Sequence, residues 1–132
     1  MSSETKKRVL ILDDEVAFCE TLKMRLQTFG YSVQTASTAR EAWQTLLASP
    51  PDILLLDIRM PEEDGFTFMR RVRSYRNAND SELEAKVRQL PIIVVTGVGE
   101  GMKSLFEQEH VTAYITKPID STVLKKLIEE NT

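Results

Sequence analysis

Three short apolar runs stand out along the chain, and none of them alternates with polar residues. Uninterrupted runs of this length are typical of strands in a parallel sheet that is covered on both faces. Two further segments are weaker strand candidates. The five predicted strands cover residues 9–12, 32–36, 53–56, 92–95 and 112–116.

Apolar residues at helical spacing fill the gaps between these strands. Gly30 follows the first stripe and predicts its end. Thr38 and Glu41 predict a capping box before the second stripe, and Asp120 or Ser121 is the expected cap of the last. The five stripes are Phe18, Leu22, Leu26 and Phe29; Ala39, Ala42, Trp43, Leu46 and Leu47; Phe66, Met69 and Val72; Met102, Leu105 and Phe106; and Val123, Leu124, Leu127 and Ile128.

A strand followed by a helix, repeated five times, predicts an α/β domain with parallel strands, right-handed crossovers and helices on both faces of the sheet. The 132 residues suit one domain, which we expect to span 1–132 with its core at about 8–130. The polar segment at about 77–88 either extends the third helix or forms a loop with its own helical turn over 82–87. Glycines at 97, 99 and 101 predict a short or loosely held fourth helix.

The composition narrows the class of protein. The chain is 42% hydrophobic and carries 17 Lys and Arg against 20 Asp and Glu, a formal charge of −3. This mild acidity argues against a direct nucleic-acid binder. Cys19 is the single cysteine, so an internal disulfide is excluded and a reducing cytoplasm is the expected compartment. Residues 1–8 lack the apolar part of a secretory signal, and no apolar run is long enough to span a bilayer.

Polar residues follow or finish four of the predicted strands. Asp13 and Asp14 follow the first, Asp57 the third and Lys117 the fifth, and Thr96 ends the fourth. Binding sites of open α/β sheets form beyond the carboxyl ends of the strands. We therefore expect three carboxylates, one hydroxyl and one ammonium to converge there.

Three neighbouring carboxylates repel one another, and one lysine does not offset them. Mg²⁺ is the expected partner, because it takes one or two carboxylates, waters and phosphate oxygens. Asp57 stands alone and is the favoured nucleophile for a phosphoryl group, while the adjacent Asp13 and Asp14 suit metal binding. Lys117 and Thr96 would contact the phosphoryl group.

Four segments resemble the receiver family of response regulators. They are Leu-Ile-Leu-Asp-Asp-Glu at 10–15, Leu-Leu-Leu-Asp-Ile-Arg-Met-Pro at 54–61 with Asp64-Gly65, Val-Val-Thr-Gly at 94–97, and Tyr-Ile-Thr-Lys-Pro at 114–118. They occur in the family's order and at nearly its spacing, over residues 8 to about 130. The resemblance implies a flavodoxin-like (βα)5 domain with strand order 2-1-3-4-5.

The resemblance also implies roles for the site residues. Asp57 would be the phosphoacceptor and would bind Mg²⁺ directly together with Asp14 and the backbone carbonyl of Arg59, with Asp13 acting through water. Lys117 would contact the phosphoryl group, and its peptide bond to Pro118 would be cis. Thr96 and Tyr114 would be the switch residues, which change the face formed by the fourth helix, fifth strand and fifth helix.

The function implied by the resemblance is a phosphorylation-dependent switch of a two-component system. A sensor histidine kinase or a phosphotransfer protein would supply the phosphoryl group, because His110 is the only histidine of this chain. The domain would dephosphorylate itself slowly and would not be a turnover enzyme. An output domain or target would bind the switching face, and no output domain is expected within these residues. Homodimerisation is left open.

Simpler readings stand beside these. The acids at 13–15 are suited to capping the first helix, and Thr96 or Lys117 alone would be ordinary strand-end residues. Tyr114 fits a half-buried strand aromatic equally well. Trp43 is expected in the core, and Cys19 is expected to be inert.

Three other functions compete with this one. A phosphohydrolase with an aspartyl nucleophile would carry Asp-x-Asp, where this chain has Asp57-Ile58-Arg59. A nucleotide or flavin binder needs a glycine-rich loop after the first strand, where three acids stand here. A degenerate receiver that binds partners without phosphate would lack some of the site residues, all of which are present.

Overall fold

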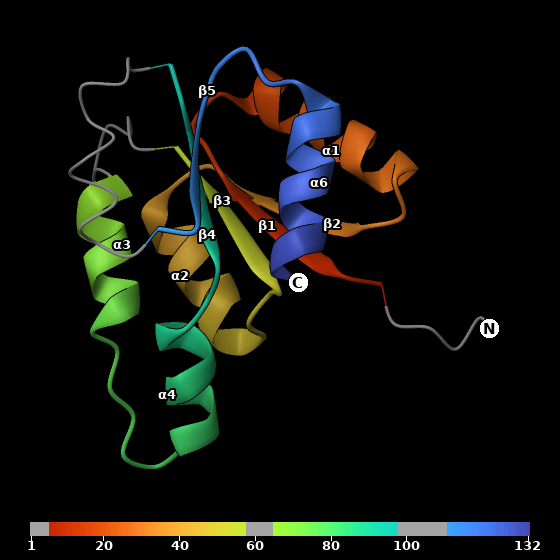
Figure 1. The fold of residues 1–132 in the computed structure, drawn as a ribbon. Coiled ribbons are helices and arrows are strands. Elements are labelled where there is room, and N and C mark those ends of the chain that lie inside the picture. Colours follow the sequence, from red (N-terminus) through yellow and green to blue (C-terminus); the bar gives the residue numbers. More distant parts are fainter. Residues whose placement is uncertain (1–5, 58–64, 98–110) are drawn as a thin grey trace.

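The computed structural model describes residues 6–57, 65–97 and 111–132 (Figure 1). The strands agree with the predicted ranges to within one residue at each end. The elements are β1 (Arg8–Leu12), α1 (Val16–Thr28), β2 (Ser32–Ala36), α2 (Ala39–Ala48), β3 (Ile53–Leu56), α3 (Gly65–Arg73), α4 (Ser81–Arg88), β4 (Ile92–Thr96), β5 (Ala113–Thr116) and α6 (Ser121–Asn131).

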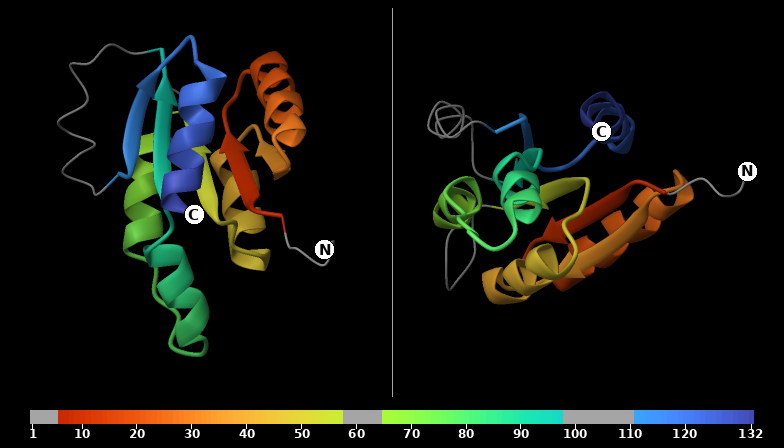
Figure 2. Two further views of the ribbon diagram at one scale, coloured as in Figure 1. Left: turned by 45° about the vertical axis from the view of Figure 1, so that its right-hand side comes forward. Right: turned by 90° about the horizontal axis from the view of Figure 1, so that it is seen from below.

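The strands form one sheet in the order β2-β1-β3-β4-β5, and every neighbouring pair is parallel. The predicted α/β class and strand order are thus confirmed. Figure 2 shows helices on both faces of the sheet. All carboxyl ends of the strands lie at the same edge, so the residues that follow them are neighbours in space.

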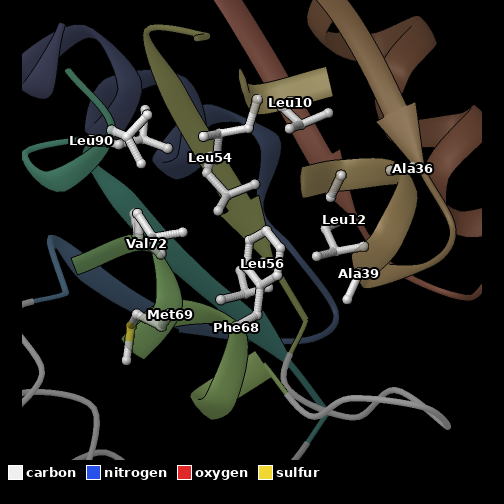
Figure 3. Packing of buried hydrophobic residues seen from close by; sticks show 14 of the residues in the cluster. Leu10, Leu12, Ala36, Ala39, Leu54, Leu56, Phe68, Met69, Val72 and Leu90 are labelled. Atoms are coloured by element: carbon white, nitrogen blue, oxygen red, sulfur yellow. The ribbon is translucent and has the colours of Figure 1, made fainter. Parts of the chain in front are cut away.

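The two faces of the sheet bury alternate residues of the same apolar runs. Even-numbered side chains of β1, β3 and β4 pack against α2, α3 and α4, in the cluster of Figure 3. Odd-numbered side chains pack against α1 and α6. Helices therefore shield both faces of the sheet from solvent, which explains why these runs contain no polar positions.

Helix α1 ends at the glycine that the sequence indicated. Gly30 has φ 96°, its N–H donates to Gln27 O at 3.0 Å, and Tyr31 N–H donates to Leu26 O at 3.2 Å. This pair of hydrogen bonds is a Schellman motif, which satisfies carbonyls at the end of the helix. The left-handed φ is what favours glycine there.

Replacing Gly30 by alanine is expected to lower the free energy of unfolding by about 1 kcal/mol, because a Cβ disfavours the left-handed conformation. Gly97→Ala is the matched control: its φ lies outside the left-handed range, and a Cβ there meets no atom of the described residues within 4 Å. It should leave stability unchanged or raise it slightly. Urea unfolding of both variants tests this, and equal losses at the two positions would contradict it.

The expected caps of two other helices are present. Glu41 N–H donates to Thr38 Oγ1 at 3.1 Å at the start of α2, and the Glu41 carboxylate accepts from Ser37 N–H at 3.0 Å. The reciprocal bond thus reaches one residue before the cap, unlike the standard capping box. At α6 the cap is Asp120, whose Oδ1 accepts from Thr122 N–H at 2.9 Å.

The polar segment before β4 contains a helix of its own, so the alternative of a continued third helix is wrong. Asp80 Oδ1 accepts from Leu83 N–H at 2.9 Å and caps α4. Glu84 Oε1 accepts from Asn77 N–H at 2.7 Å and ties the preceding turn to the helix. The segment is thus built around α4, which Figure 1 shows at the lower end of the molecule.

Two further expectations concern the fourth predicted helix and the absence of a membrane-spanning segment. The predicted fourth helix, marked by Met102, Leu105 and Phe106, falls outside the described residues. Among the residues that are described, every helix is too short or too polar to span a membrane.

Candidate functional site

The ends of β1 and β3 place two aspartates side by side. Leu12 pairs with Leu56 in the parallel register, so the next residue of each strand, Asp13 and Asp57, emerges at the same level. Asp57 N–H donates to Leu12 O at 2.9 Å, and Asp13 N–H donates to Ala36 O of β2 at 3.1 Å. The sheet hydrogen bonds therefore continue into the site and hold both backbones.

Three carboxylates gather at this edge. Asp13 and Asp57 are buried, with 1% and 5% of their surfaces exposed, and Asp14 is exposed. One carboxylate oxygen of each lies within 4.8 Å of the others. Within the described parts of the chain, Asp13 and Asp57 are the buried charged residues. The structure thus brings together the three acids that the sequence singled out.

Lys117 reaches these acids from the end of β5. Its Nζ lies 2.8 Å from Asp13 Oδ2, 3.6 Å from Asp57 Oδ2 and 2.7 Å from Glu15 Oε1. The side chain is 16% exposed. Because β5 lies at the edge of the sheet, the ammonium spans from the edge strand to the central carboxylates.

Glu15 and Phe18 hold Lys117 in a way that the sequence analysis missed. The sequence pattern predicts Glu15 as part of an acidic motif that could cap the first helix, and Phe18 as a core residue of that helix. In the structure Glu15 pairs with the ammonium, and the Phe18 ring lies 4.1 Å from Nζ. Their spacing of three residues, which places side chains on one helix face, is the signal that could have revealed this pairing.

Burial and pairing shift two pKa values in the site. Burial raises the pKa of Asp13, and the hydrogen bonds from Lys117 and from Glu15 N–H only partly oppose this effect. Burial acts to lower the pKa of Lys117, but its hydrogen bonds to Asp13 and Glu15 outweigh it and hold that pKa above its usual value. Lys117 is therefore charged at neutral pH.

The donor set fits a hard divalent cation. Asp13, Asp14, Glu15 and Asp57 together carry an excess of three negative charges over Lys117 when all are ionised. Like charges this close destabilise one another, so a cation binding among them is favoured. Their ligand atoms are all carboxylate oxygens, which Mg²⁺ and Ca²⁺ prefer. Within the described residues, Asp13, Asp14 and Asp57 are the group of acids suited to holding such an ion.

The structure describes three of the four remaining features that the sequence singled out. Thr96 ends β4 and pairs with Thr116, the residue before Lys117. Tyr114 lies half-buried in β5, against the cluster that α2 and α3 cover. The Lys117-Pro118 peptide is cis, as the family resemblance implied. Arg59 falls outside the described residues.

The acids after β1 do not cap α1. Glu15 is the N-cap residue, and its side chain makes no capping hydrogen bond. Asp13 Oδ1 instead accepts from Glu15 N–H at 2.9 Å, while Oδ2 faces Lys117. Both Asp13 oxygens thus serve the turn and the site, so the reading of this motif as a simple helix cap is wrong.

Cys19 lies directly under the site. It is 4% exposed, and its Sγ donates to Asp13 O at 3.3 Å. Burial, and then the negative charge of Asp13, raise the pKa of the thiol to about 12. The thiolate is the reactive form of cysteine, so this arrangement agrees with the expectation of an inert thiol.

We therefore predict slow modification of Cys19 in the folded protein. A pKa of about 12 instead of 9.0 lowers the thiolate fraction about a thousandfold at pH 8. Reaction with a disulfide reagent at that pH should be at least about a hundredfold slower without urea than in unfolding urea. Equal rates in the two conditions would show that the thiol is accessible and ionisable in the native state.

A family model and similar proteins of known sequence point to the same family. A family model described as a response regulator receiver domain matches residues 9–129. The chain is 34% identical over 126 residues to a probable transcriptional regulator, ycf27, of Guillardia theta. It is 35% identical over 113 residues to the virulence transcriptional regulatory protein PhoP of Salmonella typhimurium. These matches cover 95% and 84% of this chain but 45% of each relative, so the chain spans about half of their length.

Solved structures agree with the fold over nearly the whole chain. The chemotaxis protein CheY4 of Vibrio cholerae superposes with a TM-score of 0.83 at 25% identity, and the match covers 97% of this chain and 100% of CheY4. A CheY-like receiver domain protein of Methanospirillum hungatei matches with a TM-score of 0.79 at 29% identity, over 96% of this chain and 93% of that one.

Proposed function

Because the chain belongs to the response regulator receiver domain family, we propose that it is a Mg²⁺-dependent phosphorylation switch whose phosphoacceptor is Asp57. The observation that carries the proposal is the cluster in which the Asp57 carboxylate meets two other carboxylates and the Lys117 ammonium. Asp57 is the central one of these acids, at the end of β3 between β1 and β4.

The proposed reaction transfers a phosphoryl group from a phosphohistidine of another protein. An Asp57 oxygen forms a bond to phosphorus, the phosphorus–nitrogen bond of the donor breaks, and the histidine nitrogen keeps the electron pair and takes up a proton. Lys117 Nζ lies 3.6 Å from Asp57 Oδ2 and would pair with the arriving phosphoryl oxygens, which this distance supports. Slow hydrolysis of the aspartyl-phosphate resets the switch, so the protein is a regulator and not a turnover enzyme.

The carboxylates of Asp13, Asp14 and Asp57 would hold the Mg²⁺, with the backbone carbonyl of Arg59 as a further proposed ligand. When bound, the ion supplies positive charge that offsets the carboxylates and the phosphoryl oxygens. Asp13 N–H donates to Ala36 O, and Asp13 Oδ1 accepts from Glu15 N–H. These two hydrogen bonds fix the residue, which limits the rearrangement that metal binding requires.

Signal output is proposed to pass through Thr96 and Tyr114. Thr96 ends the strand next to Asp57's own, and Tyr114 lies opposite Val94 in the neighbouring strand β5. A phosphoryl group on Asp57 would attract the Thr96 hydroxyl, and Tyr114 would move inward behind it. This changes the face around β5 and α6 and its affinity for a target or output domain.

The proposed donor is a sensor histidine kinase or a phosphotransfer protein in the cytoplasm. A groove of about 550 Å³ opens beside Lys117 between α1 and the segment before α6. Phe18, Leu22, Pro118 and Ile119 line it, which suits the apolar surface of a docking helix. The relatives carry names of transcriptional regulators and of a chemotaxis protein, so the property they share is the receiver domain and not one output.

Acetyl phosphate tests the proposed chemistry without a partner protein. Incubation with acetyl phosphate and Mg²⁺ should increase the intact mass by one phosphoryl group, and removal of Mg²⁺ should abolish the increase. An unchanged mass with Mg²⁺ present would contradict the proposal.

Asp14→Asn is expected to weaken Mg²⁺ binding by at least about tenfold, because it removes a ligand charge. The metal-free protein should lose no stability, since Asp14 is exposed and its charge repels the other two acids. Glu20→Gln, an exposed acid on α1 outside the cluster, is the control. Titration with Mg²⁺, followed by amide chemical shifts, measures both. The same affinity in Asp14→Asn and wild type would exclude Asp14 as a ligand.

A further inference from the structure

A second pocket lies at the opposite end of the sheet from the carboxylates. Its volume is about 690 Å³. It opens where β4 and β5 begin, next to the C-terminal ends of α3, α4 and α6. The lining includes Arg73, Glu84, Arg88, Leu90, Pro91 and Thr112. Helix α4, the helix of the polar segment, forms much of its wall.

Arg73 has a structural role in this pocket. Its Nη1 donates to Arg88 O at 3.0 Å and to Leu90 O at 2.7 Å. The guanidinium thus satisfies carbonyls at the end of α4, which helix geometry leaves without partners. It also fixes the wall from which the Arg88 side chain projects.

Arg88 is different, because no carboxylate of the described residues forms an ion pair with its guanidinium. Its Nη1 is buried, and no acceptor for it occurs among the residues that the structure describes. Glu84, the carboxylate of the lining, is occupied elsewhere: it accepts from Asn77 N–H at 2.7 Å and lies 3.8 Å from Arg76 Nη1. A guanidinium does not lose its proton in proteins, so the charge persists in a partly dry environment.

We propose that this pocket binds a small molecule carrying a carboxylate or phosphate group, which pairs with Arg88. The guanidinium charge is delocalised over three nitrogens, so an oxyanion need not reach the covered Nη1 to offset it. Leu90, Pro91 and Ala85 provide apolar wall for the remainder of the ligand. The ligand would contact α4 and the starts of β4 and β5 together, far from Asp57, and its binding does not depend on the proposed phosphorylation.

Benzoate and inorganic phosphate are suitable probes, and benzamide is the neutral control for benzoate. Each is titrated at low ionic strength into ¹⁵N-labelled protein from which metal has been removed on a chelating resin. Benzoate, phosphate or both should give saturable shifts of the Arg88 side-chain N–H and of the Gln89 and Thr112 amides. Saturation by benzoate alone assigns a carboxylate ligand, and saturation by phosphate alone assigns a phosphate. Benzamide should give no saturable shift.

Arg88→Gln should weaken the binding of the effective probe by about tenfold or more, the loss expected for a charge-assisted hydrogen bond. Arg40→Gln, an exposed arginine on α2, should leave it unchanged. The wild-type titration decides the matter even if a variant is unstable. The proposal is overturned if neither anion saturates in wild type, if benzamide binds as well as benzoate, or if Arg88→Gln binds like wild type.

Discussion

Asp57→Asn is expected to abolish phosphorylation, lowering the rate of modification by acetyl phosphate by a thousandfold or more, on the order of losses seen when a nucleophile is removed. An amide oxygen is a poor nucleophile and cannot form the mixed anhydride. The substitution is nearly isosteric and removes one of the two negative charges that are buried among the described residues, so the fold should persist. Intact-mass measurement after incubation with acetyl phosphate and Mg²⁺ gives the rate.

Asp52→Asn is the matched control, because Asp52 precedes β3 and Asp57 follows it. Asp52 is exposed, and its Oδ2 accepts from Arg8 N–H at 2.7 Å, a bond that asparagine can keep. It should be phosphorylated at the wild-type rate. Modification of Asp57→Asn at a similar rate to wild type would place the phosphoacceptor elsewhere.

Lys117→Met should have two separable effects. The free energy of unfolding without Mg²⁺ should fall by about 2 kcal/mol, because Asp13 and Asp57 are left buried without their paired cation. The rate of phosphorylation should fall by about a hundredfold or more, because a charge-assisted contact to the phosphoryl group is lost. Mg²⁺ should restore part of the stability but not the rate. Urea unfolding and the mass assay measure the two effects.

Lys125→Met is the matched control, because Lys125 also lies over an aromatic ring and pairs with a glutamate. Its Nζ lies 5.7 Å from the Phe29 ring and 3.1 Å from Glu129, and the Lys125 side chain is 36% exposed. Such exposed pairs contribute about 0–1 kcal/mol, and no change of rate is expected. An Lys117→Met protein with unaltered phosphorylation would show that Lys117 only stabilises the pocket.

The convergence of the site was predictable because it follows from topology. Asp13, Asp57 and Lys117 each follow a predicted strand, and parallel strands bring such residues to one edge. The relative levels of the side chains were not predictable, since they depend on the register of Leu12 with Leu56. Repeated strand-helix units carry no local mark of that register.

The contacts around Lys117 could not be predicted from local sequence patterns. Phe18 has the spacing of a core residue and does pack against the core beneath α1, yet its ring also lies over the ammonium. That second contact joins α1 to the end of β5, about a hundred residues later, and no periodicity reports it. The ion pair of Glu15 with Lys117 spans the same distance in sequence, so the capping role that its position suggests does not reveal it.

The helix before β4 could have been predicted more firmly. Asp80 stands before an acidic first turn with Glu82 and Glu84, and Lys86 and Arg88 fill the last turn. This is the charge order that the helix dipole favours. The pocket against Arg88, in contrast, arises from the ends of three separate helices and had no sequence signal.

Beryllofluoride binding tests the central claim most directly, because the claim is that Asp57 and a carboxylate-bound Mg²⁺ together receive a phosphoryl group. Fluorine NMR of the wild-type protein with beryllofluoride and Mg²⁺ should show a protein-bound signal. The signal should be absent without Mg²⁺ and absent in Asp57→Asn. A bound signal of equal strength without Mg²⁺, or in Asp57→Asn with Mg²⁺, would contradict the account.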